Sequence, residues 1–320
     1  MGFKSGLRAF CKKNAVLSRQ YDKLTWYKSK LQTLLISDEA YAKSHYKKAT
    51  GKELHLDNPQ TFDEKLWYLK LHNRDPLLTI CSDKYRVREY VKQCGYREIL
   101  NELYGVYDDA RDIPFDSFTE PVFLKCNHGS GENIIYYPDK PFDREDFIKR
   151  FNFLLKQNSY TKSREWNYKN ILPKIVAERV LRDKNGNLPL DYKFLCFHGE
   201  PKLMYWSKGG CAENGTHQIV SKRYLNTYDM DFQLTEIDEG FPINYEDVEK
   251  PNGFEMMKEM ARVLSKPFIH ARVDFMVCDD DIYLSEITFY DGGGCNGIKP
   301  AEWDYRIGSW IDLTKVKETI

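Results

Sequence analysis

The sequence has no paired cysteines, no long apolar run and no excess of charge of either sign. Its 8 cysteines are scattered without a CxxC pair, so zinc and redox motifs are not indicated and reduced buried thiols are expected. No apolar run approaches the ~20 residues of a membrane-spanning helix, and no signal peptide is recognisable, which predicts a cytoplasmic protein without a transmembrane segment. Lysine plus arginine and aspartate plus glutamate each number 48, so the overall charge does not favour a nucleic-acid partner.

The composition is that of a folded protein with more than one structural unit. The chain of 320 residues exceeds a typical domain of ~100–200 residues. Hydrophobic residues make up 42% and aromatic residues 14% of the chain, which argues against disorder. No repeat of fixed period is present, so solenoids and propellers are set aside. We expect two or three subdomains and a cleft deep enough for a ligand.

One local charge bias lies near the N-terminus. Residues 4–30 contain eight lysines or arginines and a single acid, Asp22, with aromatic residues among them. This composition predicts a basic helical arm. One interpretation is a solvated helix that packs through its apolar side. The other is peripheral contact with a membrane surface, an anionic polymer or a protein partner.

Capping residues, turns and hydrophobic periodicity predict a succession of helices and strands. Thr61, followed three residues later by Glu64, has the spacing of a capping box, so a helix is expected to begin there and to continue to Leu71. Further helices are expected at residues 82–93, 144–157 and 253–264, and strands at 122–125, 134–137, 174–181, 192–197, 202–206, 271–277 and 282–287. The last four strands are expected to form two antiparallel hairpins.

A glycine-rich loop follows the strand that ends near Lys125. Residues 127–131 include Gly129 and Gly131, which lack side chains and so let backbone N–H groups approach phosphate oxygens. The segment matches neither the P-loop nor the dinucleotide fingerprint, because the lysine precedes the loop and strands flank it on both sides. It is either a flap that covers phosphates or an ordinary hairpin turn.

The late hairpin places two carboxylates opposite each other. Asp274 lies within one apolar strand and Glu286 near the end of its partner. Two carboxylates with oxygen ligands around them suit Mg²⁺, which binds a few carboxylates together with phosphate oxygens and water. The alternative is a structural salt bridge in which Arg272 or a lysine neutralises the two acids.

Three more charged residues share faces with these strands. Arg272 is two residues before Asp274 and should therefore point to the same side of the sheet, beside the proposed metal and phosphates. Asp191 and Lys193 likewise alternate onto one face of their strand. Lys193 is a second candidate for a phosphate clamp, although a surface ion pair with Asp191 is the alternative.

The order of these motifs resembles that of the ATP-grasp family. The resemblance covers residues 61–311 and is strongest to a subgroup similar to teichuronopeptide-biosynthesis proteins, which function in bacterial capsule and cell-wall polysaccharides. It is carried by Asp83-Lys84, Glu178 in Val-Ala-Glu-Arg-Val-Leu, Asp191-Tyr192-Lys193, Arg-Val-Asp at 272–274 and Ser-Glu-Ile-Thr at 285–288. Segments 58–62, 124–131, 163–166 and 302–305 also resemble stretches of that subgroup.

The resemblance implies roles for individual positions. Lys84 and Lys125 would hold the phosphates of ATP, and His128, Gly129, Ser130 and Gly131 would form the mobile flap over them. Glu178, Val180 and Leu181 would lie where a hinge strand meets adenine, with backbone groups of residues 179–181 reading its edge. Asp274 and Glu286 would bind Mg²⁺. Many members carry Asn two residues after the glutamate, whereas this chain has Thr288, whose hydroxyl would serve directly or through water and which puts a two-metal site in doubt.

The resemblance also implies an architecture and an activity. The expected fold is an α/β (α+β) ATP-grasp fold, with ATP between a central flap subdomain and a C-terminal antiparallel sheet, preceded by a helical arm. The expected parts are residues 1–55 for the arm, 56–120 for an N-terminal α/β part, 121–176 for the flap subdomain and 177–320 for the C-terminal subdomain.

The expected activity is an ATP-dependent carboxylate–amine ligase that acts, through an acyl phosphate, on a uronic-acid carboxyl of a polysaccharide or its precursor. In that reaction Lys125, Lys193 and Arg272 would surround the developing phosphoryl charge. The expected partners are a carbohydrate carboxylate and a small amine. Candidate cations for the acidic acceptor are Arg164, Lys208, Arg223 and Lys299.

Two alternatives remain. One is a sugar kinase in which Asp191 acts as the base. The other is a glycosyltransferase or a non-catalytic polysaccharide-assembly protein.

Overall fold

The computed structural model describes residues 15–129, 131, 133–209, 215, 223–246 and 248–317. Ser130 of the glycine-rich loop and the first 14 residues of the basic arm lie outside this described part, as do Cys11 and Cys211. The six described cysteines are free thiols, and four of them are buried, as the scattered spacing predicted.

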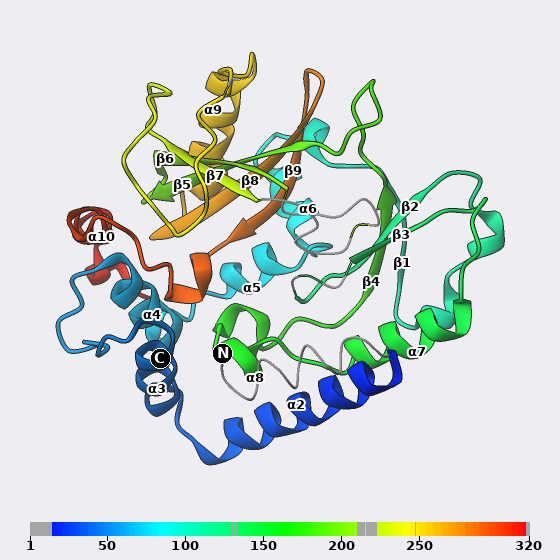
Figure 1. The fold of residues 1–320 in the computed structure, drawn as a ribbon, viewed down its shortest axis with the longest axis horizontal. Helices are drawn as coiled ribbons and strands as arrows, with labels where there is room; N and C mark the ends of the chain where they lie inside the picture. Colours follow the sequence, from blue (N-terminus) through cyan, green and yellow to red (C-terminus); the bar gives the residue numbers. More distant parts are fainter. Residues whose placement is uncertain are drawn as a thin grey trace.

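Two antiparallel sheets form the frame of the molecule (Figure 1). The first has the strand order β1-β4-β2-β3 and the second the order β7-β6-β5-β8-β9. The strands of the first sheet are β1 (Leu103–Tyr107), β2 (Val122–Cys126), β3 (Asn133–Tyr136) and β4 (Ile175–Arg179). Those of the second are β5 (Leu190–Phe197), β6 (Glu200–Lys208), β7 (Tyr224–Tyr228), β8 (His270–Cys278) and β9 (Asp281–Thr288).

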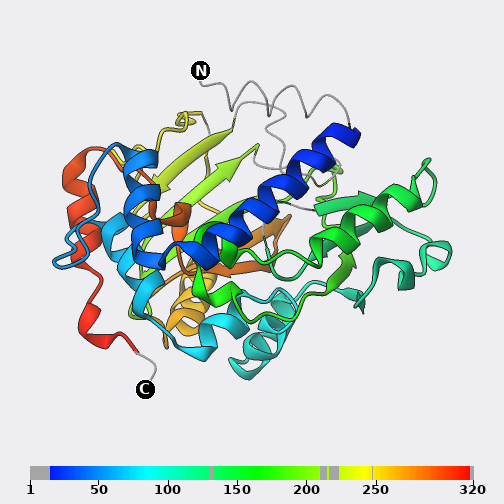
Figure 2. The ribbon, with the colours of Figure 1, turned by 90° about the horizontal axis from the view of Figure 1, so that it is seen from below.

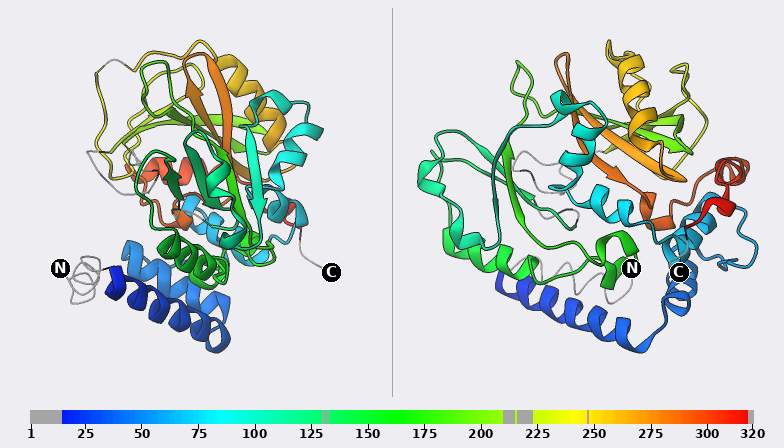
Figure 3. Two further views of the ribbon diagram at one scale, coloured as in Figure 1. Left: turned by 90° about the vertical axis from the view of Figure 1, so that its right-hand side faces the viewer. Right: turned by 180° about the vertical axis from the view of Figure 1, so that it is seen from behind.

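Helices surround and connect the two sheets (Figures 1 and 3). They are α2 (Ala15–Leu35), α3 (Asp38–Thr50), α4 (Phe62–His72), α5 (Pro76–Ser82), α6 (Val87–Gln93), α7 (Arg144–Leu154), α8 (Tyr160–Ser163), α9 (Phe254–Ser265) and α10 (Ala301–Ser309). Short 3₁₀ turns lie at Arg97–Ile99, Ala110–Asp112, Phe115–Ser117, Trp166–Tyr168, Asp291–Gly294 and Leu313–Lys315. Helices α5 and α6 lie between the two sheets, whereas α2 runs along the outer side of α7 (Figures 1 and 2).

Local sequence explains where several of these elements begin. The capping box predicted at Thr61 is confirmed, because the Thr61 hydroxyl accepts the Glu64 N–H and the Glu64 carboxylate accepts the Thr61 N–H. Helix α9 turns an apolar stripe that includes Phe254, Met257 and Leu264 onto β5, β6 and β8. Both late hairpins are confirmed, β5 with β6 and β8 with β9.

Apolar side chains gather into three clusters. The largest surrounds the second sheet, with α4, α5, α6 and α9 packed on it. A second cluster under the first sheet is rich in phenylalanine and includes Phe115, Phe147 and Phe151. A third joins α3 to α4 around Tyr46 and Trp67. Because each sheet has its own core, the space between the sheets is free to hold polar groups.

Two expectations about element boundaries are corrected. The helix predicted at residues 82–93 begins later, since Ser82 is the last residue of α5, a turn follows, and α6 begins at Val87. The strand predicted at 174–181 ends at Arg179, so that Val180 and Leu181 follow the strand. The expected boundary between residues 176 and 177 falls inside β4, and the four-part division of the chain stays a prediction. No helix of the described residues is both long and apolar enough to cross a membrane.

Candidate functional site

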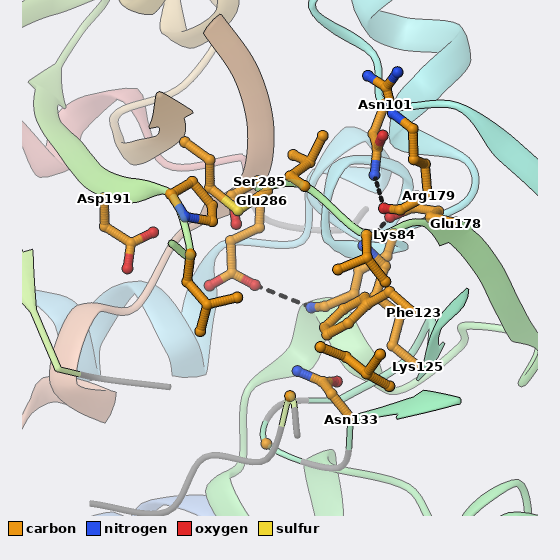
Figure 4. Close-up of a pocket in the computed structure, with 18 of the residues that line it drawn as sticks. Lys84, Asn101, Phe123, Lys125, Asn133, Glu178, Arg179, Asp191, Ser285 and Glu286 are labelled. Carbon is orange, nitrogen blue, oxygen red and sulfur yellow. Dashed lines mark hydrogen bonds and ion pairs between the residues drawn. The ribbon is translucent and has the colours of Figure 1, made fainter. Parts of the chain in front are cut away.

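A cavity of about 240 Å³ lies between the two sheets and collects most of the predicted site residues (Figure 4). The first sheet contributes side chains of β2, β3 and β4, and the second contributes side chains of β5, β8 and β9. The predicted residues that line it are Lys84, Lys125, Gly131, Glu178, Val180, Leu181, Asp191, Lys193 and Glu286. Residues more than 200 positions apart in the chain, Lys84 and Glu286, thus face one space.

Lys125 and Glu178 form an ion pair on the wall that the first sheet provides. Strands β2 and β4 are antiparallel neighbours, and the Lys125 Nζ lies 2.6 Å from a carboxylate oxygen of Glu178. A guanidinium nitrogen of Arg88 lies 3.5 Å from the other oxygen. A buried carboxylate requires such partners. Two cations therefore surround one anion, which leaves this wall with a net positive charge.

Lys84 reaches the cavity from the turn between α5 and α6. The buried Asp83 carboxylate accepts the backbone N–H groups of Tyr85 and Arg86 at 2.9 and 3.2 Å, which holds the chain in a turn. It also accepts the Asn127 side-chain amide at 2.9 Å, and the Lys84 N–H donates to the Asn127 carbonyl. The lysine and the start of the glycine-rich loop are thereby tied together.

The acidic hairpin has the pairing that its spacing predicted. Asp274 and Glu286 are direct partners in the register of β8 and β9. Glu286 accepts a hydrogen bond from the Lys84 Nζ at 3.0 Å, and the Thr288 hydroxyl lies 3.3 Å from its other oxygen. The Glu286 side chain is 31% exposed, whereas Asp274 is fully buried. Glu286 is therefore the carboxylate that is open to the cavity.

Asp274 is enclosed by two cations. The Arg272 guanidinium donates to both of its oxygens, at 2.8 and 2.7 Å, and the Lys193 Nζ donates to one of them at 3.0 Å. Arg272 shares its face with Asp274, as the alternation predicted, and also contacts Asp291. Lys193 lies 3.6 Å from Asp191, so that it bridges two carboxylates.

These contacts favour the charged forms of Glu286, Lys193 and Arg272. The Lys84 ammonium, with Arg272 and Lys193, holds the pKa of Glu286 well below its usual range against the effect of burial. Burial by itself lowers the pKa of Lys193, but the carboxylates of Asp191 and Asp274 raise it above the ordinary value. Burial likewise lowers the pKa of Arg272, but the carboxylates of Asp274 and Asp291 raise it well above its usual range. Glu286, Lys193 and Arg272 are therefore charged at neutral pH.

The donor set suits a hard divalent cation with few protein ligands. Within the described residues, no group of three or more His, Cys, Asp or Glu side chains is clustered as a metal site. Mg²⁺, however, binds through one or two carboxylates together with phosphate oxygens and water. Glu286, Asp274 and the Thr288 hydroxyl provide such an oxygen set beside two lysines. The residues present therefore fit Mg²⁺ with a phosphate ligand and do not form an all-protein cage.

Apolar side chains also line the cavity. Val180 and Leu181 are joined there by Phe123, Ile135 and Met276. The Asn101 side-chain amide donates to the Arg179 carbonyl at 2.9 Å and so fixes the chain just before Val180. The sequence interpretation missed Phe123 and Met276, although each is two residues from a predicted site residue and alternation would have placed it on the same face.

Several predicted residues are not part of the lining, among them Arg272, Asp274 and Thr288. Both ring nitrogens of His128 are engaged, with the Asn127 side-chain oxygen at 3.2 Å and the Leu154 carbonyl at 3.1 Å, and burial lowers the pKa of the ring. His128 thus anchors the base of the glycine-rich loop and does not line the cavity. Gly129 also lies outside the lining, and Ser130 lies outside the described residues.

The candidates for holding an acidic acceptor separate into two groups. Arg164 is fully buried and bound to Asp38 at 3.0 Å and to the Thr33 hydroxyl at 2.8 Å, so its expected contact with an acceptor is wrong. Arg223 lines the cavity, whereas Lys208 and Lys299 are exposed outside its lining.

A second buried charge cluster was missed by the sequence interpretation. Lys70 on α4 donates to the Gly293 carbonyl at 2.5 Å, and its ammonium lies 3.8 Å from the centre of the Trp67 ring. Burial lowers the pKa of Lys70, while the nearby Glu165 carboxylate opposes that shift. The cluster adjoins the 3₁₀ turn Asp291–Gly294, which carries the Asp291 that contacts Arg272. The charged region thus continues beyond the cavity, and Glu165 lies in the segment 163–166 singled out above.

Comparison with known proteins identifies one family. A model of the TupA-like ATP-grasp family matches residues 64–312. Among curated proteins there is no significant match. Similar solved structures include D-alanine–D-alanine ligase from Bacillus anthracis (16% identity, 67% of this chain and 59% of that chain, TM-score 0.38). They also include L-amino acid ligase from Bacillus licheniformis (14% identity, 68% and 44%, TM-score 0.41) and the ATP-grasp ligase PsnB complexed with minimal precursor, Mg and ADP (8% identity, 75% and 62%, TM-score 0.37). The matched region spans less than two thirds of the length of each of these three ligases.

Proposed function

The chain belongs to the TupA-like ATP-grasp family, and we propose that it is an ADP-forming ligase that joins a carboxylate to an amine. The proposed carboxylate is a uronic acid of a bacterial surface polysaccharide or its precursor, as the teichuronopeptide-like motifs suggest. One observation carries the proposal. Lys84, Lys125, Lys193 and Glu286 come from distant segments and line a single cavity between two sheets.

The cavity offers both kinds of group that ATP requires. Phe123, Ile135 and Met276, together with Val180 and Leu181, supply apolar surface of the kind that an adenine ring covers. Lys84, Lys125 and Lys193 supply ammonium groups for the triphosphate, a chemistry in which lysine acts as a point charge. The proposed position of the phosphates is beside these lysines and Glu286.

Glu286, Asp274 and Thr288 are proposed to hold Mg²⁺. When bound, Mg²⁺ would neutralise charge on the phosphates that transfer and leave. Glu286 is the first candidate ligand because it is open to the cavity, whereas Asp274 is enclosed by Arg272 and Lys193. The ammonium groups that pair with these carboxylates would move toward the phosphate oxygens of the nucleotide.

The proposed reaction has two steps, and its atoms balance. An oxygen of the substrate carboxylate attacks the γ-phosphorus of ATP, and the bond to the bridging oxygen breaks to release ADP. The amine nitrogen then attacks the acyl carbon, inorganic phosphate leaves, and the nitrogen loses a proton to form the amide. Negative charge spreads over the phosphoryl oxygens in the first step, and Lys125, Lys193 and Arg272 supply fixed positive charge there. In other enzymes, removing one donor that stabilises developing negative charge raises the activation free energy by about 3–4 kcal/mol.

Water must be kept from the acyl phosphate between the steps. The glycine-rich loop at residues 127–131 is proposed to close over the cavity and exclude it. Its base is fixed, because Asn127 is bound to Asp83 and His128 to Leu154.

A product analysis tests the proposal. We expect the full chain, incubated with ATP, Mg²⁺, uronate glycans and a pool of amines, to release ADP and phosphate only when both acceptor and amine are present. Lys125→Ala should abolish this release, whereas the exposed Lys202→Ala should not. AMP release, or full activity of Lys125→Ala, would contradict the proposal.

A kinase that phosphorylates a sugar hydroxyl is the second candidate. It is favoured by one observation, namely that the Asp191 carboxylate lines the cavity and is near Lys193, where it could accept a hydroxyl proton. A stable phosphorylated glycan formed without any amine would identify this reaction. The glycosyltransferase alternative has no comparable support, because the family match points to ATP.

A further inference from the structure

Helix α2 carries its leucines on the side that faces away from the protein. Its inner side packs through Trp26, whose ring lies edge-on to Phe153 at 5.7 Å, and through Thr33, whose hydroxyl accepts from Arg164. Leu24 is two positions before Trp26, and Leu31 is two positions before Thr33. On a helix of 3.6 residues per turn, each leucine therefore points about 160° away from the inner residue that follows it. They are accordingly 70% and 56% exposed.

The exposed leucines form a continuous stripe. Leu17, Leu24 and Leu31 repeat every seven residues, which is two turns of helix, and Tyr27, Leu34 and Leu35 fill the space between and after them. All six are among the large hydrophobic side chains that the described part of the chain exposes. Contiguous apolar surface of this kind marks an interaction site. We call it the α2 stripe.

Charge on both sides of the stripe distinguishes its possible occupants. Lys23, Lys28 and Lys30 are exposed beside it, and Asp22 is the only acid in the helix sequence. A second copy of α2, packed through the heptad leucines, would bring these lysines against lysines, with Asp22 as the only acid of each helix to pair with them. An anionic bilayer would take the leucines below its headgroups while the lysine stems reach up to the phosphates.

We propose that the α2 stripe docks the protein on an anionic lipid surface, with α2 lying in the plane of the interface. The inference goes beyond the ligase activity and does not rest on it, because α2 contributes no residue to the cavity between the sheets. Figure 2 shows α2 at the periphery of the molecule, outside α7, where a flat surface can approach it. Docking by one amphipathic helix is peripheral and reversible.

Vesicle flotation of the full chain tests the proposal. We expect the protein to float with phosphatidylcholine vesicles that contain about 30 mol% phosphatidylglycerol, and much less with pure phosphatidylcholine, because each lysine near an anionic surface contributes roughly fivefold in affinity. High salt should release it. The double variant Leu24→Glu/Leu31→Glu should lower binding more than tenfold. The matched control is Leu172→Glu, because Leu172 is 75% exposed but lies outside α2.

A second variant separates the charges from the leucines. Replacing Lys23, Lys28 and Lys30 with glutamine keeps the stripe and should remove the preference for anionic over neutral vesicles. The replaced side chains are all exposed, although the ammonium groups of Lys23 and Lys30 lie 5.7 and 5.6 Å from the ring centres of Phe153 and Trp26. Thermal melting of both variants is therefore measured alongside, so that a loss of binding at an unchanged melting temperature reports on docking and not on folding.

Three results would overturn the proposal. The first is no flotation with anionic vesicles, and the second is equal flotation of Leu24→Glu/Leu31→Glu and Leu172→Glu. The third is a dimer, detected by light scattering, that the double variant converts to a monomer without any vesicle binding by the unsubstituted chain. That last result would assign the stripe to a second copy.

Discussion

Replacing Glu286 with glutamine separates a metal ligand from a structural ion pair. The substitution keeps the shape of the side chain but removes the charge that Lys84 contacts at 3.0 Å and Arg272 at 3.8 Å. Two unit charges 4 Å apart interact by about 1 kcal/mol in water and by about 4 kcal/mol at an effective dielectric constant of 20. Because the Glu286 side chain is 31% exposed, we place its attraction for Lys84 at about 1–2 kcal/mol.

This magnitude predicts opposite effects on two measurements. ATP without metal must draw Lys84 away from Glu286, so Glu286→Gln should bind metal-free ATP about 5- to 30-fold more tightly. The same variant lacks the carboxylate that is open to the cavity. Adding Mg²⁺ should therefore raise the ATP affinity of the variant about 100-fold less than it raises that of the unsubstituted protein. The rate of ADP release should fall by about 100-fold or more. If Glu286 and Lys84 formed only a structural ion pair, neither the metal-free ATP affinity nor the effect of Mg²⁺ would change.

Titration calorimetry with ATP, once in the presence of a chelator and once with Mg²⁺, measures both effects. The control is Asp281→Asn, because Asp281 is exposed at the start of the same strand, β9. If Glu286→Gln keeps the Mg²⁺ dependence of the unsubstituted protein, Glu286 is not a metal ligand. If its metal-free affinity is also unchanged, Lys84 does not contact the triphosphate.

Three further predictions test other parts of the site. Lys125→Met should weaken ATP binding at least tenfold in calorimetry while changing the urea midpoint little, because Glu178 keeps its contact with Arg88; unchanged affinity would remove Lys125 from the phosphate site. The pKa of Glu286 is lowered by folding, so its contribution to stability is complete above pH ~4.3 and is lost as the pH falls further. The free energy of unfolding, measured with urea, should therefore be lower at acid than at neutral pH. This difference should be smaller in Glu286→Gln. Arg164→Met should lower the free energy of unfolding by about 1–3 kcal/mol, since it removes the ion pair of Arg164 with Asp38 and its hydrogen bond to the Thr33 hydroxyl, yet it should not change the KM for the acceptor; a large rise in KM would contradict the burial argument.

Elements that depend on nearby residues could be predicted from the sequence. The capping box at Thr61 was confirmed because its two hydrogen bonds join residues three apart. The pairing of Asp274 with Glu286 was confirmed, but it depends on an irregularity in the ladder between Asp274 and Phe275. The register next to the turn, with Cys278 opposite Asp281, would by alternation alone place Ser285 opposite Asp274. The helix predicted over residues 82–93 was wrong at its start, since Asp83 uses its carboxylate to form a turn that no periodicity reveals.

The direction of single side chains was less predictable. His128 stands beside two glycines in a loop that resembles a phosphate flap, yet its ring is taken up by Asn127 and Leu154. Leu154 is the last residue of α7 and lies 26 positions after His128, and the loop sequence contains no sign of this contact. Arg164 likewise has the composition of a surface cation, and only the packing of α2 and α3 against it explains its burial.

The sequence by itself determined seven of the nine described strands, the hairpin that carries the two acids, and the family to which the chain belongs, because these depend on local periodicity and on motif order; it missed β1 and β7. Only the tertiary structure decided that Lys84, Lys125 and Lys193 share one cavity, that Asp274 is closed while Glu286 is open, and that the leucines of α2 face outward. The physical reason is that charge partners and burial are set by segments that meet in space. A lysine has the same appearance in a sequence whether it faces a carboxylate, a phosphate or water.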